Sequence, residues 1–162
     1  MANPVSSANL FGHPIHPMLI PFPIAFFVAT LVCDLAFGQT GYPIWITAAT
    51  WLLGAGLIMA ALAAAAGLTD FLGDGRIRNI SAAWQHAIGN VIAVVISLFN
   101  FYWHYSRAAD AVLPVGLVSS LVVVGILLFT GWMGWEMVYR HRVAVYDEPG
   151  QEANPRAKER VS

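Results

Sequence analysis

Four long apolar segments limit the folds that this chain can adopt. They cover residues 18–37, 44–68, 82–103 and 113–138. Each is close in length to the roughly 20 apolar residues that cross the hydrocarbon core of a bilayer. Because the links between them are short, consecutive segments must lie antiparallel and side by side. The sequence therefore predicts an all-α integral membrane protein, folded as an antiparallel four-helix transmembrane bundle.

Composition supports this class and excludes others. The chain is 58% hydrophobic and 10% charged, which is unlike an average soluble domain. After residue 142 the sequence turns polar, so we expect residues 1–142 to form one transmembrane domain and residues 143–162 a disordered tail. A net charge of −1 leaves no basic surface for nucleic acid. The only cysteine, Cys33, lies in an apolar segment, which excludes an intrachain disulfide and a thiolate metal cluster.

The basic residues predict the orientation of the bundle. Seven of the 8 Lys and Arg residues follow the second or the fourth apolar segment, and Arg107 alone lies on the opposite side. Basic residues concentrate in the cytoplasmic loops of membrane proteins. We therefore expect the N-terminus, the C-terminus and the link after the second segment to be cytoplasmic.

The motif Gly12-His13-Pro14-Ile15-His16-Pro17 precedes the first apolar segment. Proline disfavours helical geometry in the residue before it, so His13 and His16 are both predicted to lie in extended or turn conformations at the membrane edge. Pro21 and Pro23 follow closely, and Pro23 is deep enough to bend a helix. The first span should therefore begin irregularly.

Polar residues recur along the third segment at alternating steps of four and three. They are His86, Asn90, Ser97, Asn100 and His104, with Ala93 completing the series. This spacing places them on one helix face, which should point into the bundle. Asp34 in the first segment also needs a buried partner. Two interpretations remain open: hydrogen bonds that fix helix register, or a proton or small-ion path that ends at Asp34.

Antiparallel threading brings side chains from all four spans to the cytoplasmic end. They are His13, His16, Asp70, His86, Glu136, Tyr139 and His141. Imidazoles and acids from facing helices bind haems and metals in bundles. A simpler interpretation exists for one acid, because Glu136 and Arg140 have the four-residue spacing of a helical ion pair.

Several of these motifs resemble a known family. They are Gly12-His13-Pro14-Ile15-His16-Pro17-Met18, Pro21-Phe22-Pro23-Ile24, Asp34-Leu35, Gly67-Leu68-Thr69-Asp70, the helix around His86, Gly131-Trp132-Met133-Gly134-Trp135-Glu136 and Val138-Tyr139-Arg140-His141. The chain is similar to the bacterial membrane proteins grouped as domain of unknown function 2231, although Trp135 stands where members often have a second glycine. The resemblance implies a four-span protein of the bacterial inner membrane, with a Rieske-type iron–sulfur protein as a candidate redox partner. It supplies no established activity.

Two classes of function follow. In the first, the protein binds a b-type haem for electron transfer, with His86 as one axial ligand and His16 or His13 as the other. A nonhaem iron or zinc site would instead use these imidazoles with Asp70 or Glu136. In the second class, the protein is a non-catalytic membrane anchor or subunit that docks a partner protein. Small-residue helix faces also permit a homo-oligomer.

We do not expect an enzyme. The sequence contains no phosphate-binding loop, no nucleotide fingerprint and no recognisable arrangement of nucleophile and base.

Overall fold

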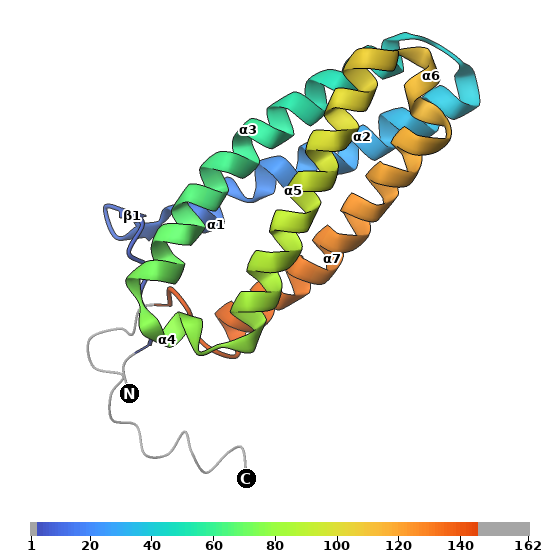
Figure 1. Cartoon of the computed structure of the whole chain (residues 1–162). Helices are drawn as coiled ribbons and strands as arrows, with labels where there is room; N and C mark the ends of the chain where they lie inside the picture. Colours follow the sequence, from blue (N-terminus) through green and yellow to red (C-terminus); the bar gives the residue numbers. More distant parts are fainter. Residues whose placement is uncertain (1–2, 146–162) are drawn as a thin grey trace.

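The computed structural model describes residues 3–145 and consists of four membrane-length helical spans (Figure 1). The first span combines α1 (Ile15–Leu19) and α2 (Pro21–Thr40). The other spans contain α3 (Ile44–Gly73), α5 (Ser81–Arg107) and α7 (Leu117–Tyr139). All four are long and apolar enough to cross a membrane, which confirms the predicted all-α bundle. The tail predicted from residue 143 lies outside the described residues, except for its first three.

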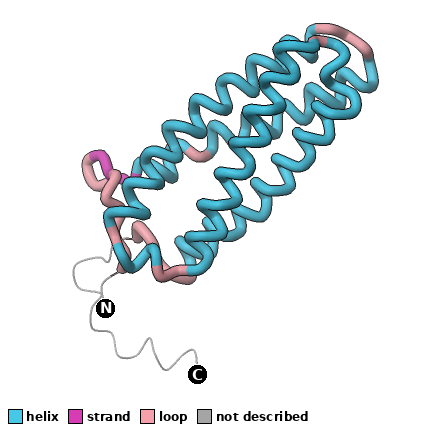
Figure 2. The backbone as a smooth tube through the Cα atoms, in the orientation of Figure 1, coloured by secondary structure: helices cyan, strands magenta, loops and turns pink. Residues whose placement is uncertain are grey.

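Short elements close the ends of the bundle (Figure 2). The strands β1 (Asn9–Leu10) and β2 (His13–Pro14) form an antiparallel hairpin before α1. Gly12 in its turn has a φ of 82°, a conformation that glycine adopts without steric cost. At the same end, α4 (Gly75–Arg78) links α3 to α5. At the opposite end, α6 (Ala109–Ala111) and the π-helical turn η1 (Val112–Gly116) link α5 to α7.

The prolines at the start of the first span separate two helices. Pro21 and Pro23 lie in the first turn of α2, where the missing N–H groups would have no helical partner. The span is interrupted at Ile20, between α1 and α2, which confirms the irregular start. The prediction of extended or turn geometry is correct for His13 in β2 and wrong for His16, which is helical in α1. Because α1 has only five residues, Pro17 removes no hydrogen bond from it.

Two helical hairpins make up the bundle. In the first, α2 packs mainly on α3, and in the second, α5 packs mainly on α7. The hairpins meet at a core of Phe27, Leu53, Ala60 and Val123. Small residues permit close approach, because a Cβ at Gly56 would lie 2.6 Å from the ring of Phe27.

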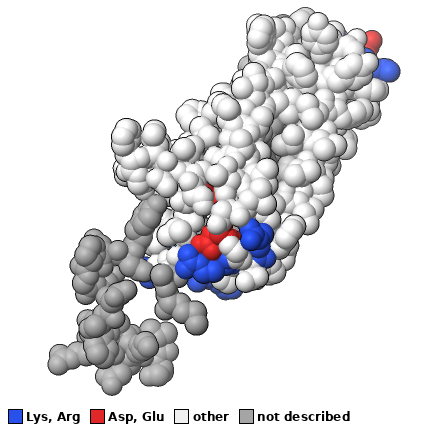
Figure 3. All heavy atoms as spheres, turned by 60° about the vertical axis from the view of Figure 1, so that its left-hand side comes forward, with Lys and Arg blue, Asp and Glu red and all other residues white. Residues whose placement is uncertain are grey.

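Charged side chains gather at the end of the molecule that carries α4. Figure 3 shows blue and red groups there, next to a long body that is almost entirely uncharged on this face. Arg76, Arg78 and Asp74 belong to this end, whereas Arg107 and Asp110 lie at the opposite end. The basic α4 end is the one that the sequence predicts to be cytoplasmic.

Candidate functional site

Two imidazoles face each other between the hairpins at the α4 end. His16 comes from α1 and His86 from α5. Their ring centroids are 6.1 Å apart, and the ring planes make an angle of 83°. The structure thus brings together two of the predicted ligands, one from each hairpin.

Each imidazole is fixed by the backbone of the other helix in its own hairpin. His16 Nδ1 lies 2.7 Å from the carbonyl oxygen of Ala63 in α3, and His86 Nδ1 lies 2.8 Å from that of Thr130 in α7. A carbonyl oxygen can only accept a hydrogen bond, so each Nδ1 must carry a proton. In the neutral form of each ring, the lone pair is then on Nε2. Metal-binding histidines are commonly oriented in this way.

A glycine makes room for each ring. A Cβ at Gly67 would lie 2.9 Å from His16 Nδ1, and a Cβ at Gly134 would lie 3.4 Å from His86 Cε1. Sequence reasoning placed both glycines in family motifs but did not assign them this role. Each hairpin contains one of these histidines and one of these glycines, and this combination could have indicated the role. The glycine and the histidine can be paired only when the packing of the two helices is known.

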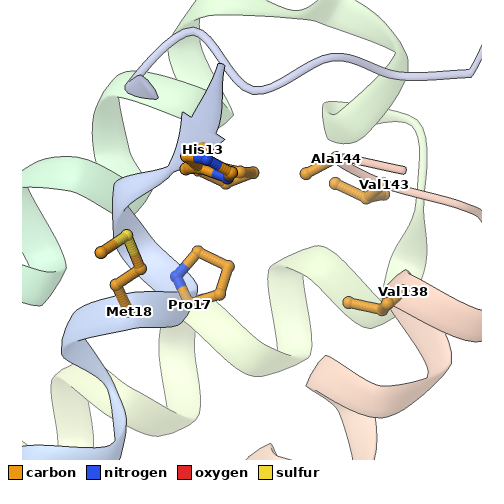
Figure 4. Close-up of a pocket in the computed structure, with 7 residues that line it drawn as sticks. His13, Pro17, Met18, Val138, Val143 and Ala144 are labelled. Carbon is orange, nitrogen blue, oxygen red and sulfur yellow. The ribbon is translucent and has the colours of Figure 1, made fainter. Parts of the chain in front are cut away.

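His13 does not join this pair. It is exposed in β2 and lines a hollow of about 530 Å³ at the membrane edge. In Figure 4, His13, Pro17 and Met18 lie on one side of this hollow, and Val138, Val143 and Ala144 lie on the other. His16, rather than His13, is therefore the imidazole that meets His86.

The predicted acidic ligands have other partners. Asp70 accepts hydrogen bonds from Ser6 Oγ at 2.8 Å and from the backbone N–H of Ala8 at 2.7 Å, so it fixes the N-terminal segment. Glu136 accepts a long hydrogen bond of 3.4 Å from Arg140, the partner that the four-residue spacing predicted.

The remaining predicted residues at this end face outward. Tyr139 and His141 are both exposed. Within residues 3–145, no three His, Cys, Asp or Glu side chains form a group that could hold a metal ion.

A second pair, Asp34 and His104, is buried near the opposite end. His104 Nε2 lies 3.0 Å from Asp34 Oδ1, and both side chains are fully buried. Ser120 of α7 donates to Asp34 Oδ2 at 2.6 Å, and Asn100 Nδ2 donates to Ser120 Oγ at 3.0 Å. The partner that Asp34 was predicted to need is therefore supplied by both α5 and α7.

The polar line of α5 is divided into two groups. Asn90 donates to the carbonyl oxygen of His86 at 2.7 Å, whereas Asn100 belongs to the Asp34 network. The buried Ser97 lies between these two groups along the helix, next to the core cluster and to Val94 and Leu127, which pack against that cluster. The hydrogen bonds of Asn90 and Asn100 support a role in helix register, and the proton or ion path stays a prediction.

Four membrane-length helices, with a partly buried imidazole pair at one end and a buried Asp–His pair near the other, define a multi-pass membrane protein. The chain belongs to the family described as predicted membrane protein (DUF2231), whose model matches residues 12–147. The matched region contains all four spans and begins at the His-Pro motif, which confirms the resemblance. No curated protein and no solved structure is significantly similar to the chain.

Proposed function

We propose that the protein binds a b-type haem between His16 and His86 and transfers electrons within the membrane. The observation that carries this proposal is the facing pair of imidazoles, each with its Nδ1 proton directed to a backbone carbonyl. His16 from one helical hairpin and His86 from the other would hold the haem. Haem supplies one-electron redox chemistry when it is bound.

The residues present fit this group in their spacing. Metal–nitrogen bonds to histidine are about 2 Å long. Two imidazoles whose ring centroids lie 6.1 Å apart are therefore close enough to hold one metal ion together. Gly67 and Gly134 form the cradle for the rings, because a Cβ at either position would crowd an imidazole.

The protein's own groups would orient and tune the site. The Nδ1–H donation to Ala63 and Thr130 selects the ring tautomer and makes Nε2 a stronger base. The donor set also favours haem over nonhaem iron or zinc. A mixed site would require a carboxylate, and Asp70 and Glu136 are both engaged by other groups.

We also propose where in the cell the protein lies. The family resemblance and the basic α4 end support a bacterial inner-membrane protein with both termini in the cytoplasm. The resemblance also suggests a Rieske-type iron–sulfur protein as the redox partner. The alternative functions are a non-catalytic membrane anchor or subunit that docks a partner protein and a proton or ion path. The small-residue helix faces permit a homo-oligomer with each of these functions.

An absorption spectrum of detergent-purified protein, produced with an ample haem supply, tests the proposal. We expect Soret and α bands after dithionite reduction, and their loss in His16→Ala and in His86→Ala. The exposed histidines provide matched controls, so His13→Ala and His141→Ala should retain both bands. A wild-type protein without haem bands would contradict the proposal. Zinc or iron found by metal analysis in such a protein would instead indicate a nonhaem site.

A further inference from the structure

The Asp34 network has a hydrogen-bonding pattern that points to a ligand. We infer that it is an internal proton-binding site, which holds a single proton between His104 Nε2 and Asp34 Oδ1 beside one buried water molecule. This inference is independent of the haem proposal, because it concerns the opposite end of the bundle.

All other hydrogen atoms in the network have fixed positions. The Ser120 hydroxyl has one hydrogen, which it donates to Asp34, so it must accept from the Asn100 amide. His104 Nδ1 lies 3.0 Å from the carbonyl oxygen of Asn100 and must carry a proton. The contact between His104 Nε2 and Asp34 Oδ1 is then the one position whose proton count is open.

Because the pair is buried, we expect one proton at this contact. Without a proton, the carboxylate would face the Nε2 lone pair and leave a net negative charge in the interior. With two protons, a carboxylic acid would face an imidazolium and leave a net positive charge. A single shared proton makes the pair neutral overall on whichever atom it lies. Because both side chains are fully buried, an uncompensated charge there would be strongly unfavourable.

The titratable groups on the elements packed around this pair do not change the balance. Tyr105 and Arg107 on α5, Asp110 on α6 and Tyr42 before α3 are all exposed. Cys33 on α2 is buried next to Asp34 in the sequence. On α7, the group that faces Asp34 is the Ser120 hydroxyl.

Two unpaired atoms indicate the water molecule. Ser97 Oγ and Asn100 Oδ1 are buried, and neither has a hydrogen-bond partner among the described residues. Such groups in native proteins are usually satisfied by protein or by ordered water. The two residues are three positions apart on one helix face, so one water molecule can contact both.

The network contains Ser, His and Asp without being a nucleophilic triad. The Ser120 hydroxyl donates to the carboxylate rather than to the imidazole, so His104 is not placed to remove its proton. The arrangement retains a proton rather than activating a hydroxyl.

Nitrogen-15 NMR of histidine-labelled protein in detergent tests the proton count. We expect the His104 ring signals, assigned by their absence in His104→Gln, to stay constant between about pH 5 and pH 9, because a change in protonation would leave a net charge in the buried pair. A change in these signals over that pH range would overturn the inference.

The isosteric variant Asp34→Asn provides a second test. Its amide can donate to His104 Nε2 and accept from Ser120, so His104 should become a neutral ring protonated at Nδ1. A His104 ring that carries protons on both nitrogens in this variant would contradict the inference, because it would leave a net positive charge beside a neutral amide. If the variant does not fold, the wild-type titration still decides the question.

The water molecule has its own test. Water-to-protein NMR transfer should reach the Asn100 amide in the wild type and disappear in Ser97→Val, in which the valine side chain fills the space. Absence of this transfer in the wild type would contradict the buried water molecule. The histidine signals test the shared proton separately.

Discussion

Gly67 and Gly134 occupy equivalent positions in the two hairpins. The carbonyl oxygens of Ala63 and Thr130 accept hydrogen bonds from the two imidazoles. Gly67 lies one helical turn after Ala63, and Gly134 lies one turn after Thr130. Asp34 and His104 are 70 positions apart, and His16 and His86 have the same separation. The hairpins are therefore pseudo-equivalent units, and each polar pair combines corresponding positions from both of them.

Gly67 lies closer to its imidazole than Gly134 does, so alanine substitutions at the two positions should reduce haem binding to different extents. Gly67→Ala should displace His16, because the new Cβ would lie 2.9 Å from Nδ1. Gly134→Ala should have a smaller effect at 3.4 Å. The measurement is the amount of haem bound per protein, with Gly125→Ala as the control because its Cβ would meet nothing within 4 Å. Equal haem content in Gly67→Ala and Gly125→Ala would show that the close approach at Gly67 is unimportant.

Removal of the Asp34 side chain should destabilise the bundle strongly. Asp34→Ala leaves His104 and Ser120 without their buried partner, and breaking such a pair costs on the order of 3–5 kcal/mol. Asp34→Asn keeps the shape and the hydrogen bonds, so its cost should be much smaller. Unfolding in mixed detergent micelles measures both free energies. Equal destabilisation of the two variants would contradict this expectation.

Asp70 is expected to fix the N-terminal segment rather than to bind a metal. Asp70→Ala removes the acceptor for Ser6 and Ala8, so the amides of that segment should exchange with solvent faster. Hydrogen–deuterium exchange with mass spectrometry measures this change. The neighbouring Thr69→Ala is a suitable control, because the Thr69 hydroxyl donates to the carbonyl oxygen of Ala65 in its own helix. Similar protection in both variants would contradict this role.

Asp74 should make a pH-dependent contribution to the stability of the folded protein. The Arg76 side chain donates to Asp74, and this holds the pKa of the carboxyl group far below its usual value of 3.8. Because the pKa is lower in the folded state, the stabilisation is complete above the unfolded-state value and is lost as the pH falls through the folded-state value.

Unfolding of wild type and Asp74→Asn should therefore differ by a constant free energy from neutral pH down to about pH 4 and by less in stronger acid. A difference that already disappears near pH 6 would assign the effect to another group. Arg78→Gln is a useful comparison, because Arg78 donates to the carbonyls of Phe71 and Leu72 rather than to an acid.

The sequence was sufficient to predict the bundle because hydrophobic length and short links leave few arrangements. It also predicted that Asp34 needs a buried partner, since an ionisable group inside a span is costly. The helices nevertheless extend beyond the predicted spans, as in α3 and α5, because apolarity marks only the part that crosses hydrocarbon. Helical geometry continues into the polar edges.

The choice between His13 and His16 depended on local structure that periodicity does not reveal. The hairpin of β1 and β2 places His13 at the edge, and the single turn of α1 directs His16 to α3. The involvement of Asp70 was also hidden, because its partners Ser6 and Ala8 lie in a segment without a regular pattern.

The layer of Phe27, Leu53 and Val123 has an electrical consequence. It continues the insulating hydrocarbon of the surrounding lipid through the centre of the protein, so a transmembrane voltage should fall mainly across this layer. The imidazole pair and the Asp34–His104 pair would then each remain close to the potential of the nearer aqueous compartment.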